Sequence, residues 1–280
     1  MLTASAKIRR RIRRRPRCNI DYDILAPIWM TPKPQIRFMA VRKQFGGTVV
    51  LDGVDFDVTS GQFWGLAGVN GAGKTTLIKC LLDFIEPDSG SIELNGTSFR
   101  EARSRRTLVY LPERFIPPYF LSGAEFIRSM LGLYGQQFDV DRVDAICEEL
   151  ELSPESLKKP VRSLSKGMTQ KLGLAVCFLS RRDIYILDEP MSGLDPIARV
   201  RVKRLLAGLR SEGRTVLFTS HSLPDIEEIC DHMAVLHKGK IAWWGAPSDL
   251  RERSGGKSLE TAFLECLEAC DRTTEAERIH

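Results

Sequence analysis

Short apolar runs alternate along the chain with helix-spaced segments and polar turns. The five residues 63–67 and the β-branched run 184–187 have the length and composition of buried parallel strands. Residues 75–82 instead place apolar side chains at helical spacing directly after a glycine-rich turn. The pattern predicts an α/β core with parallel strands at 63–67, 106–111, 183–187 and 214–219.

Two other regions differ from this core. Gln35–Val58 and Gly90–Gly96 are β-rich and are separated by turn signals, which predicts a smaller antiparallel sheet. Between Phe115 and Val161 the sequence favours helices at 124–134 and 140–150. We therefore predict an α/β fold with a parallel core sheet, a smaller antiparallel β subdomain and an inserted helical subdomain.

A phosphate-binding pattern lies between the first core strand and its helix. Residues 68–75 fit GxxxxGK[ST], and the flanking strand and helix supply the structural context that this pattern needs. Backbone N–H groups of such a loop surround phosphates, the lysine reaches the terminal phosphates, and the hydroxyl of Thr75 binds Mg²⁺. The predicted nucleotide-binding residues here are Gly68, Asn70, Gly71, Ala72, Gly73, Lys74, Thr75 and Thr76. The parallel core sheet is therefore predicted to be that of a P-loop NTPase.

Two carboxylates end the strand at 184–187. In an open α/β sheet, the carboxyl ends of parallel strands lie beside the phosphate loop. Asp188 is therefore a candidate Mg²⁺ ligand, and Glu189 is the candidate general base for an attacking water. Two acidic residues at the end of a strand usually only mark a solvent-exposed strand end. Here the P-loop about 110 residues upstream favours the catalytic interpretation.

Together with four further motifs, these residues resemble the ATP-binding cassette (ABC) ATPases over residues 36–250. Leu164–Met168, followed by a helix-like segment, is similar to the signature LSGGQ, and Ser192–Asp195 is similar to the loop after the paired carboxylates. His221 stands at the position of the switch histidine. Phe45 stands where an aromatic residue stacks on adenine.

The resemblance implies that each site is shared between two subunits. The Ser165 hydroxyl and the Gly167 amide would complete the γ-phosphate site of a facing cassette, and His221 would contact the γ-phosphate. The alternatives without a functional role are that His221 is a polar loop residue and that Phe45 is a core residue.

Three positions depart from the family pattern. Lys166 and Met168 replace a glycine and the glutamine of the signature. Glu113 stands where the family usually has a glutamine that touches Mg²⁺ and water. A carboxylate there can bind Mg²⁺, but it also repels the γ-phosphate, so the two effects oppose each other.

The charge distribution argues against a nucleic-acid partner. The formal net charge is +5, but residues 1–17 carry eight basic residues and no acid, which leaves the rest of the chain slightly acidic. We interpret residues 1–34 as a disordered or artefactual extension, with Met30 as the true start in the artefactual case and a functional basic arm as the alternative. Seven cysteines without zinc-ligand spacing indicate a reducing compartment.

The predicted organisation is an ABC ATPase domain at 35–250, with its helical subdomain at about 115–165, and a helical tail at 251–280. No uncharged apolar run approaches 18 residues, so any membrane role needs a partner. The tail weakly resembles the ends of cassettes that serve export-type or ABC-2-type permeases.

The resemblance implies an ATP-hydrolysing transporter subunit at the cytoplasmic face of the membrane. It would dimerise head to tail, with itself or a second ABC subunit, on a transmembrane permease, with ATP and Mg²⁺ as cofactors. The alternative is a soluble ABC ATPase that acts on ribosomes or DNA. A small-molecule kinase would leave the signature and His221 unexplained.

Overall fold

The computed structural model describes the backbone of residues 34–278 and the side chains of residues 34–272. The extension predicted at residues 1–34 therefore lies outside the described residues, except for Pro34. The C-terminal tail predicted at 251–280 is described as far as residue 278.

A six-stranded sheet forms the centre of the described part, in the order β10-β9-β3-β8-β7-β6. Five of its strands are parallel, and β10 joins β9 antiparallel at one edge. The strands are β3 (Phe63–Ala67), β6 (Leu108–Leu111), β7 (Ile184–Asp188), β8 (Thr215–Thr219), β9 (His232–His237) and β10 (Lys240–Gly245). The four parallel strands predicted from the sequence all occur, whereas β9 and β10 were not predicted.

A four-stranded antiparallel sheet has the order β2-β1-β4-β5. Its strands are β1 (Pro34–Phe45), β2 (Thr48–Thr59), β4 (Ser89–Leu94) and β5 (Thr97–Ser98). The long hairpin β1–β2 turns through Gly46 and Gly47, both with positive φ, which glycine adopts without steric cost.

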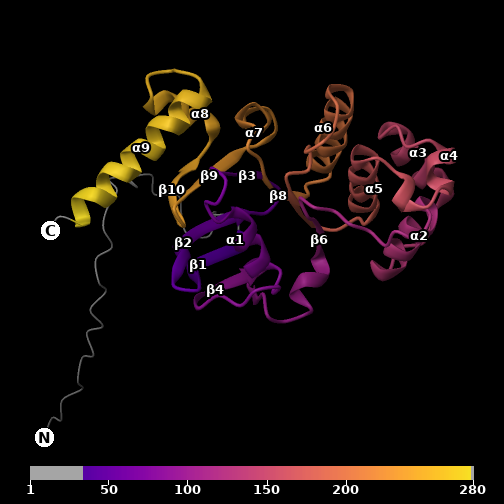
Figure 1. Ribbon diagram of the computed structural model, residues 1–280, viewed down its shortest axis with the longest axis horizontal. Coiled ribbons are helices and arrows are strands. Elements are labelled where there is room, and N and C mark those ends of the chain that lie inside the picture. The colour runs from indigo at the N-terminus through magenta and orange to yellow at the C-terminus, as the bar shows by residue number, and fades with distance from the viewer. Residues whose placement is uncertain (1–33, 279–280) are drawn as a thin grey trace, which may run out of the picture. The chain divides into compact units, whose positions relative to one another are not determined.

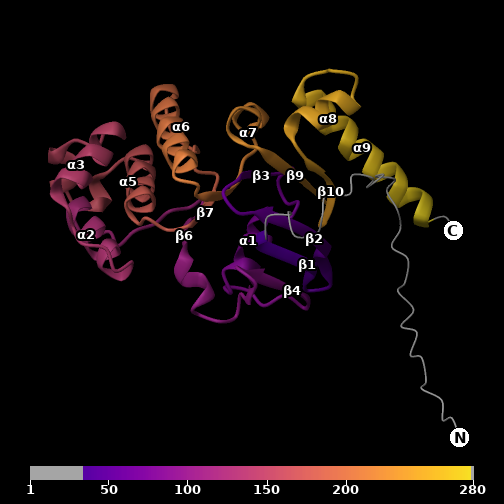
Figure 2. The same cartoon turned by 180° about the vertical axis from the view of Figure 1, so that it is seen from behind.

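Nine α-helices and two 3₁₀ turns are assigned within residues 34–278. The helices are α1 (Lys74–Leu81), α2 (Gly123–Leu133), α3 (Val140–Glu149), α4 (Pro154–Lys158), α5 (Lys166–Leu179), α6 (Pro196–Ser211), α7 (Leu223–Ile229), α8 (Pro247–Arg253) and α9 (Leu259–Arg278). The 3₁₀ turns are η1 (Ser104–Thr107) and η2 (Val161–Ser163). Figures 1 and 2 both show α2 and α3 beside α5, where they form a helical region.

The central strands β3, β7 and β8 are buried along their whole length, because apolar clusters cover both faces of the sheet there, whereas the edge strand β10 is partly exposed. On one face, Trp64 and Leu66 pack in a cluster with helix α1 and the antiparallel sheet. On the opposite face, Phe63 and Ala67 belong to a cluster that contains apolar residues of α2 through α9. Helix α1 is thus held between two sheets, which fixes the phosphate loop that precedes it.

Side-chain caps fix where two helices near the site begin. The Ser165 hydroxyl accepts a hydrogen bond from the Met168 N–H at the start of α5. The Asp195 carboxylate accepts one from the Ala198 N–H at the start of α6, where Pro196 is the first helical residue. Such caps each contribute about 1 kcal/mol to helix stability, so α5 and α6 each begin at a defined residue.

Candidate active site

The phosphate loop has the shape that its glycines permit. A side chain at Gly68 would place a Cβ 2.5 Å from the Leu236 carbonyl oxygen, so the loop backbone lies directly against the backbone of β9. Gly73 has a φ of 110°, and a Cβ there would lie 2.9 Å from the Val50 oxygen. Larger residues at either position would displace the loop from its neighbours.

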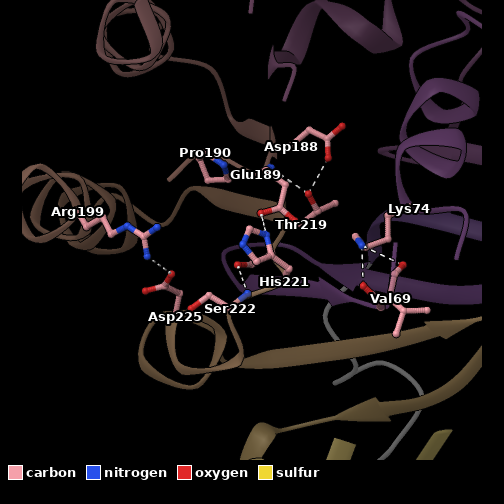
Figure 3. Close-up of polar contacts among 12 residues, drawn as sticks. Val69, Lys74, Asp188, Glu189, Pro190, Arg199, Thr219, His221, Ser222 and Asp225 are labelled. Atoms are coloured by element: carbon pink, nitrogen blue, oxygen red, sulfur yellow. Dashed lines mark hydrogen bonds and ion pairs between the residues drawn. The ribbon is translucent and has the colours of Figure 1, made fainter. Parts of the chain in front are cut away.

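Lys74 is the first residue of α1, and its side chain turns back along the loop. Its ammonium donates to the Gly68 carbonyl at 2.6 Å, and Val69 O lies 3.4 Å away (Figure 3). The residue is 8% exposed. Burial lowers the pKa of Lys74, and the negative charges of Glu189, Asp188 and Glu113 oppose this shift. Carboxylates on neighbouring elements thus help to keep a buried cation charged.

Asp188 ends β7 and is 1% exposed. The Thr75 hydroxyl donates to Asp188 Oδ2 at 3.2 Å, which joins the start of α1 to the end of β7. These two oxygen-bearing side chains come from the elements that the sequence predicted would meet. The sheet order β3-β8-β7 places β8 between the loop strand and the carboxylate strand.

Glu189 follows Asp188 and has a φ of 49°, a left-handed conformation that is uncommon for a non-glycine residue. Its Oε2 lies 2.8 Å from His221 Nδ1, and Figure 3 shows the two side chains pointing toward each other. Burial raises the pKa of Glu189, while the charge and hydrogen bond of His221 lower it. A raised pKa suits a carboxylate that must accept a proton.

These side chains surround a cavity of about 580 Å³. The residues that line it are Val50, Asn70, Gly71, Ala72, Gly73, Lys74, Thr75, Thr76, Glu113, Asp188, Glu189, Ser192 and His221. The cavity therefore brings together eleven of the predicted site residues from four separate stretches of sequence. Its volume and its charged lining side chains suit a charged nucleotide better than an apolar ligand.

Mg²⁺ fits the oxygen donors at one wall of this cavity. Thr75 Oγ1 and Asp188 Oδ2 lie 3.2 Å apart, and Mg²⁺ is commonly held by one or two protein oxygens together with phosphates and water. Glu113 lines the same cavity from the segment after β6, and its side chain is exposed. Its carboxylate therefore belongs to the lining, although within the described residues Asp188 and Thr75 hydrogen-bond to each other and Asp188 to Thr219, not to Glu113.

Within the described residues, four of the predicted site residues do not line this cavity. Gly68 supports the loop from behind, against β9. Ser165 is exposed at the start of α5, and a Cβ on Gly167 would lie 3.1 Å from the Gly193 oxygen, so the signature packs beside the loop at 192–195. Phe45 lies at the end of the β1–β2 hairpin and is 46% exposed, with the Lys43 ammonium 5.3 Å from its ring centre.

Three contributors to the site were not predicted from the sequence. Val50 and Ser192 line the cavity, and Thr219 hydrogen-bonds both to Asp188 and to the Glu189 backbone. Ser192 belongs to the Ser192–Asp195 motif noted in the sequence, but no role was predicted for Ser192 itself. Val50 and Thr219 are typical strand residues, so their proximity to the site depends on tertiary structure that local sequence does not reveal.

Comparison with known proteins agrees with this geometry. The family model described as "ABC transporter" matches residues 51–192, a segment that runs from β2 through the P-loop, the signature and the paired carboxylates. The chain belongs to this family. The predicted P-loop fold with two sheets is also confirmed: a solved structure titled "Structure of ATP binding subunit of ABC transporter" aligns with a TM-score of 0.76 and 30% identity, over 83% of this ABC chain and 99% of that chain.

Two relatives show how far the similarity extends. An uncharacterised ABC transporter ATP-binding protein of Synechocystis is 37% identical over 69% of this chain and 55% of its own length. A Nod factor export ATP-binding protein I of Burkholderia lata is 35% identical over 80% of this chain and 75% of its own. The ABC chain thus spans little more than half of the Synechocystis relative. Within residues 34–278, no helix combines the length and apolar character that crossing a bilayer requires.

Proposed function

We propose that this ABC protein binds and hydrolyses ATP to drive movement of a substrate through a separate transmembrane permease. The observation that carries the proposal is one cavity lined by the phosphate loop, a buried lysine and two strand-end carboxylates. A nucleotide-binding protein without hydrolysis would need the loop and the lysine but not a partly buried Glu189 hydrogen-bonded to His221.

Each side chain has a distinct task in this proposal. Loop N–H groups and Lys74 hold the β and γ phosphates, and Thr75 and Asp188 hold Mg²⁺. The metal, when bound, neutralises phosphate charge. Glu189 accepts the proton of the attacking water. His221 orients Glu189 and contacts the γ-phosphate.

A second copy of the chain, or a second ABC subunit, would complete the site. Ser165 and Gly167 lie at the exposed start of α5, outside the cavity of their own chain. Backbone N–H groups at a helix start attract anions, so the signature is suited to a phosphate bound by a facing cassette. ATP would then hold two cassettes together head to tail, and hydrolysis would release them. Phe45 would stack on adenine from the hairpin end.

The transport assignment rests on relatives and on surface chemistry. One similar protein is named for Nod factor export, which favours a permease of the export or ABC-2 type. Ile116, Tyr119 and Phe120 are exposed apolar residues of the segment between β6 and α2, where a membrane subunit would dock. The protein would then be peripheral at the cytoplasmic face of the membrane. Action on ribosomes or DNA has less support, because the chain outside residues 1–17 is slightly acidic.

Phosphate release by the purified chain tests the hydrolytic part. Lys74→Ala removes the buried cation, and Lys79→Ala removes an exposed lysine from the last turn of the same helix. We expect Lys74→Ala to abolish ATP hydrolysis and Lys79→Ala to preserve it. Equal activities in the two variants would contradict the proposal.

The transport part needs the membrane partner. A neighbouring reading frame with about six apolar spans of ~20 residues would supply a candidate permease. Co-purification of that permease with the ABC protein, and ATPase stimulation in proteoliposomes, would support transport. Recovery with ribosomes or DNA at physiological salt, without the permease, would favour the alternative.

A further inference from the structure

Thr219, the last residue of β8, links both carboxylates of the site. Its hydroxyl donates to Asp188 Oδ1 at 2.6 Å and accepts from the Glu189 backbone N–H at 2.9 Å (Figure 3). The residue is completely buried, and it pairs directly with Asp188 in the β7–β8 register. One hydroxyl thus uses its single proton on one carboxylate and its oxygen on the backbone of the next residue.

The first bond determines which Asp188 oxygen faces the phosphate loop. Oδ1 is engaged by Thr219, and Oδ2 lies 3.2 Å from Thr75 Oγ1. Because Asp188 is almost fully buried, a lost hydrogen bond on Oδ1 would not be replaced readily by bulk water. Without Thr219, only the 3.2 Å hydrogen bond from Thr75 would determine which Asp188 oxygen faces the loop.

The second bond acts on the backbone of Glu189. A φ of 49° costs energy for a non-glycine residue and persists only where neighbouring contacts hold it. The hydrogen bond from Glu189 N–H to Thr219 is such a contact. It holds the turn from which the Glu189 carboxylate reaches His221.

We propose that Thr219 is a positioning residue for hydrolysis, which orients Asp188 through its proton and Glu189 through its oxygen. This inference rests on the proposed function, because it assumes that Asp188 binds the metal and Glu189 is the base. In this proposal, the residue at the end of β8 orients the two carboxylates, a task that the P-loop residues do not perform.

Thr215 offers a matched control on the same strand. It is also buried, and its hydroxyl accepts a hydrogen bond from the Gly61 N–H at 2.7 Å. It begins β8, at the opposite end of the strand from Asp188 and the cavity. A valine at either position removes one buried hydroxyl from β8, so general effects on strand stability should be similar.

The experiment compares Thr219→Val, Thr219→Ser and Thr215→Val. We expect Thr219→Val to lower kcat about 10- to 100-fold and to raise the Mg²⁺ concentration that half-saturates binding of a fluorescent ATP analogue, the scale typical for loss of a group that orients a metal ligand. Analogue affinity in EDTA should stay within about 3-fold of wild type, because the loop and Lys74 are unchanged. Thr219→Ser should recover kcat to within about 3-fold, since it keeps the hydroxyl.

Thr215→Val should keep the wild-type kcat and metal dependence, even where thermal unfolding shows a loss of stability. The proposal is overturned if Thr219→Val matches Thr215→Val in both kinetic readouts, or if Thr219→Ser is as impaired as Thr219→Val. If Thr219→Val does not fold, Thr219→Ala is judged by the same criteria. Hydrolysis that survives Lys74→Ala would instead refute the proposed function, so the two failures are distinguishable.

Discussion

His221 Nδ1 lies 2.8 Å from Glu189 Oε2, and this pair joins the segment after β8 to the end of β7. His221 is largely exposed to the cavity, whereas the Glu189 side chain is mostly buried. Burial alone would favour a protonated carboxyl, and His221 counteracts it. The pair thus keeps a buried carboxylate able to accept a proton.

This relationship predicts how pH affects a His221→Ala variant. Burial has raised the pKa of Glu189, and His221 lowers it, so removing His221 raises that pKa further. Because the base must be deprotonated, activity should be lost at a higher pH as the solution is acidified. The acidic limb of the kcat/KM profile should move to higher pH. A His232→Gln control, which alters a histidine on β9 outside the cavity, should leave the limb in place, and an unmoved limb in His221→Ala would contradict the assignment.

Glu113→Gln tests one of the three positions at which the chain departs from the family pattern. A carboxylate near Mg²⁺ and the γ-phosphate experiences opposing Coulomb energies of several kcal/mol at an effective dielectric of about 20, and the doubly charged metal should dominate while it is bound. We expect ATP affinity to depend less on Mg²⁺ in Glu113→Gln than in wild type. Glu252→Gln, at an exposed position on α8, is the control. Identical metal dependence in wild type and Glu113→Gln would show that Glu113 has no role in metal binding.

Mixed dimers test whether the site is shared between two chains. In the proposed arrangement, Lys74→Ala should disable the phosphate loop, and Ser165→Arg should disable the signature that would serve the facing site. A heterodimer of the two variants would carry one doubly impaired site and one intact site. Mixing two inactive preparations should therefore restore partial ATPase activity. If no ratio restores activity, each chain hydrolyses ATP without the signature of another.

Gly68→Ala tests the close passage of the loop along β9. The added Cβ would lie 2.5 Å from the Leu236 carbonyl oxygen, a backbone atom that cannot move aside cheaply. We expect a loss of about 1–3 kcal/mol in the free energy of unfolding, together with weaker ATP binding. Gly208→Ala is the control, because a Cβ there, in the interior of α6, meets nothing within 4 Å. It should be neutral or stabilising by up to about 1 kcal/mol in the same denaturation experiment.

The parts of the site that the sequence predicted are those encoded by contiguous residues. The loop at 68–75 and the pair Asp188–Glu189 each combine their chemistry with the strand that positions it, so local patterns were sufficient. The antiparallel sheet was also predictable, because turn signals separate its strands. Roles that arise only across chains, such as those of Ser165 and Gly167, remain predictions.

The features that the sequence did not reveal depend on tertiary pairing. Thr219 looks like any β-branched strand residue until β8 pairs with β7 and places it opposite Asp188. Val50 lies on a strand of the other sheet and reaches the cavity because that sheet packs over α1. Strand β9 is a short apolar run, a pattern that does not distinguish a buried strand from a buried helical segment.

Single-turnover and steady-state hydrolysis by Glu189→Gln tests the central claim most directly, that this cavity hydrolyses ATP with Glu189 as the base. The substitution keeps the size of the side chain and removes its ability to accept a proton. We predict that ATP binding persists, that turnover falls by roughly 10² or more, and that ATP-bound dimers accumulate. Wild-type turnover in Glu189→Gln, with ATP bound normally, would contradict the account.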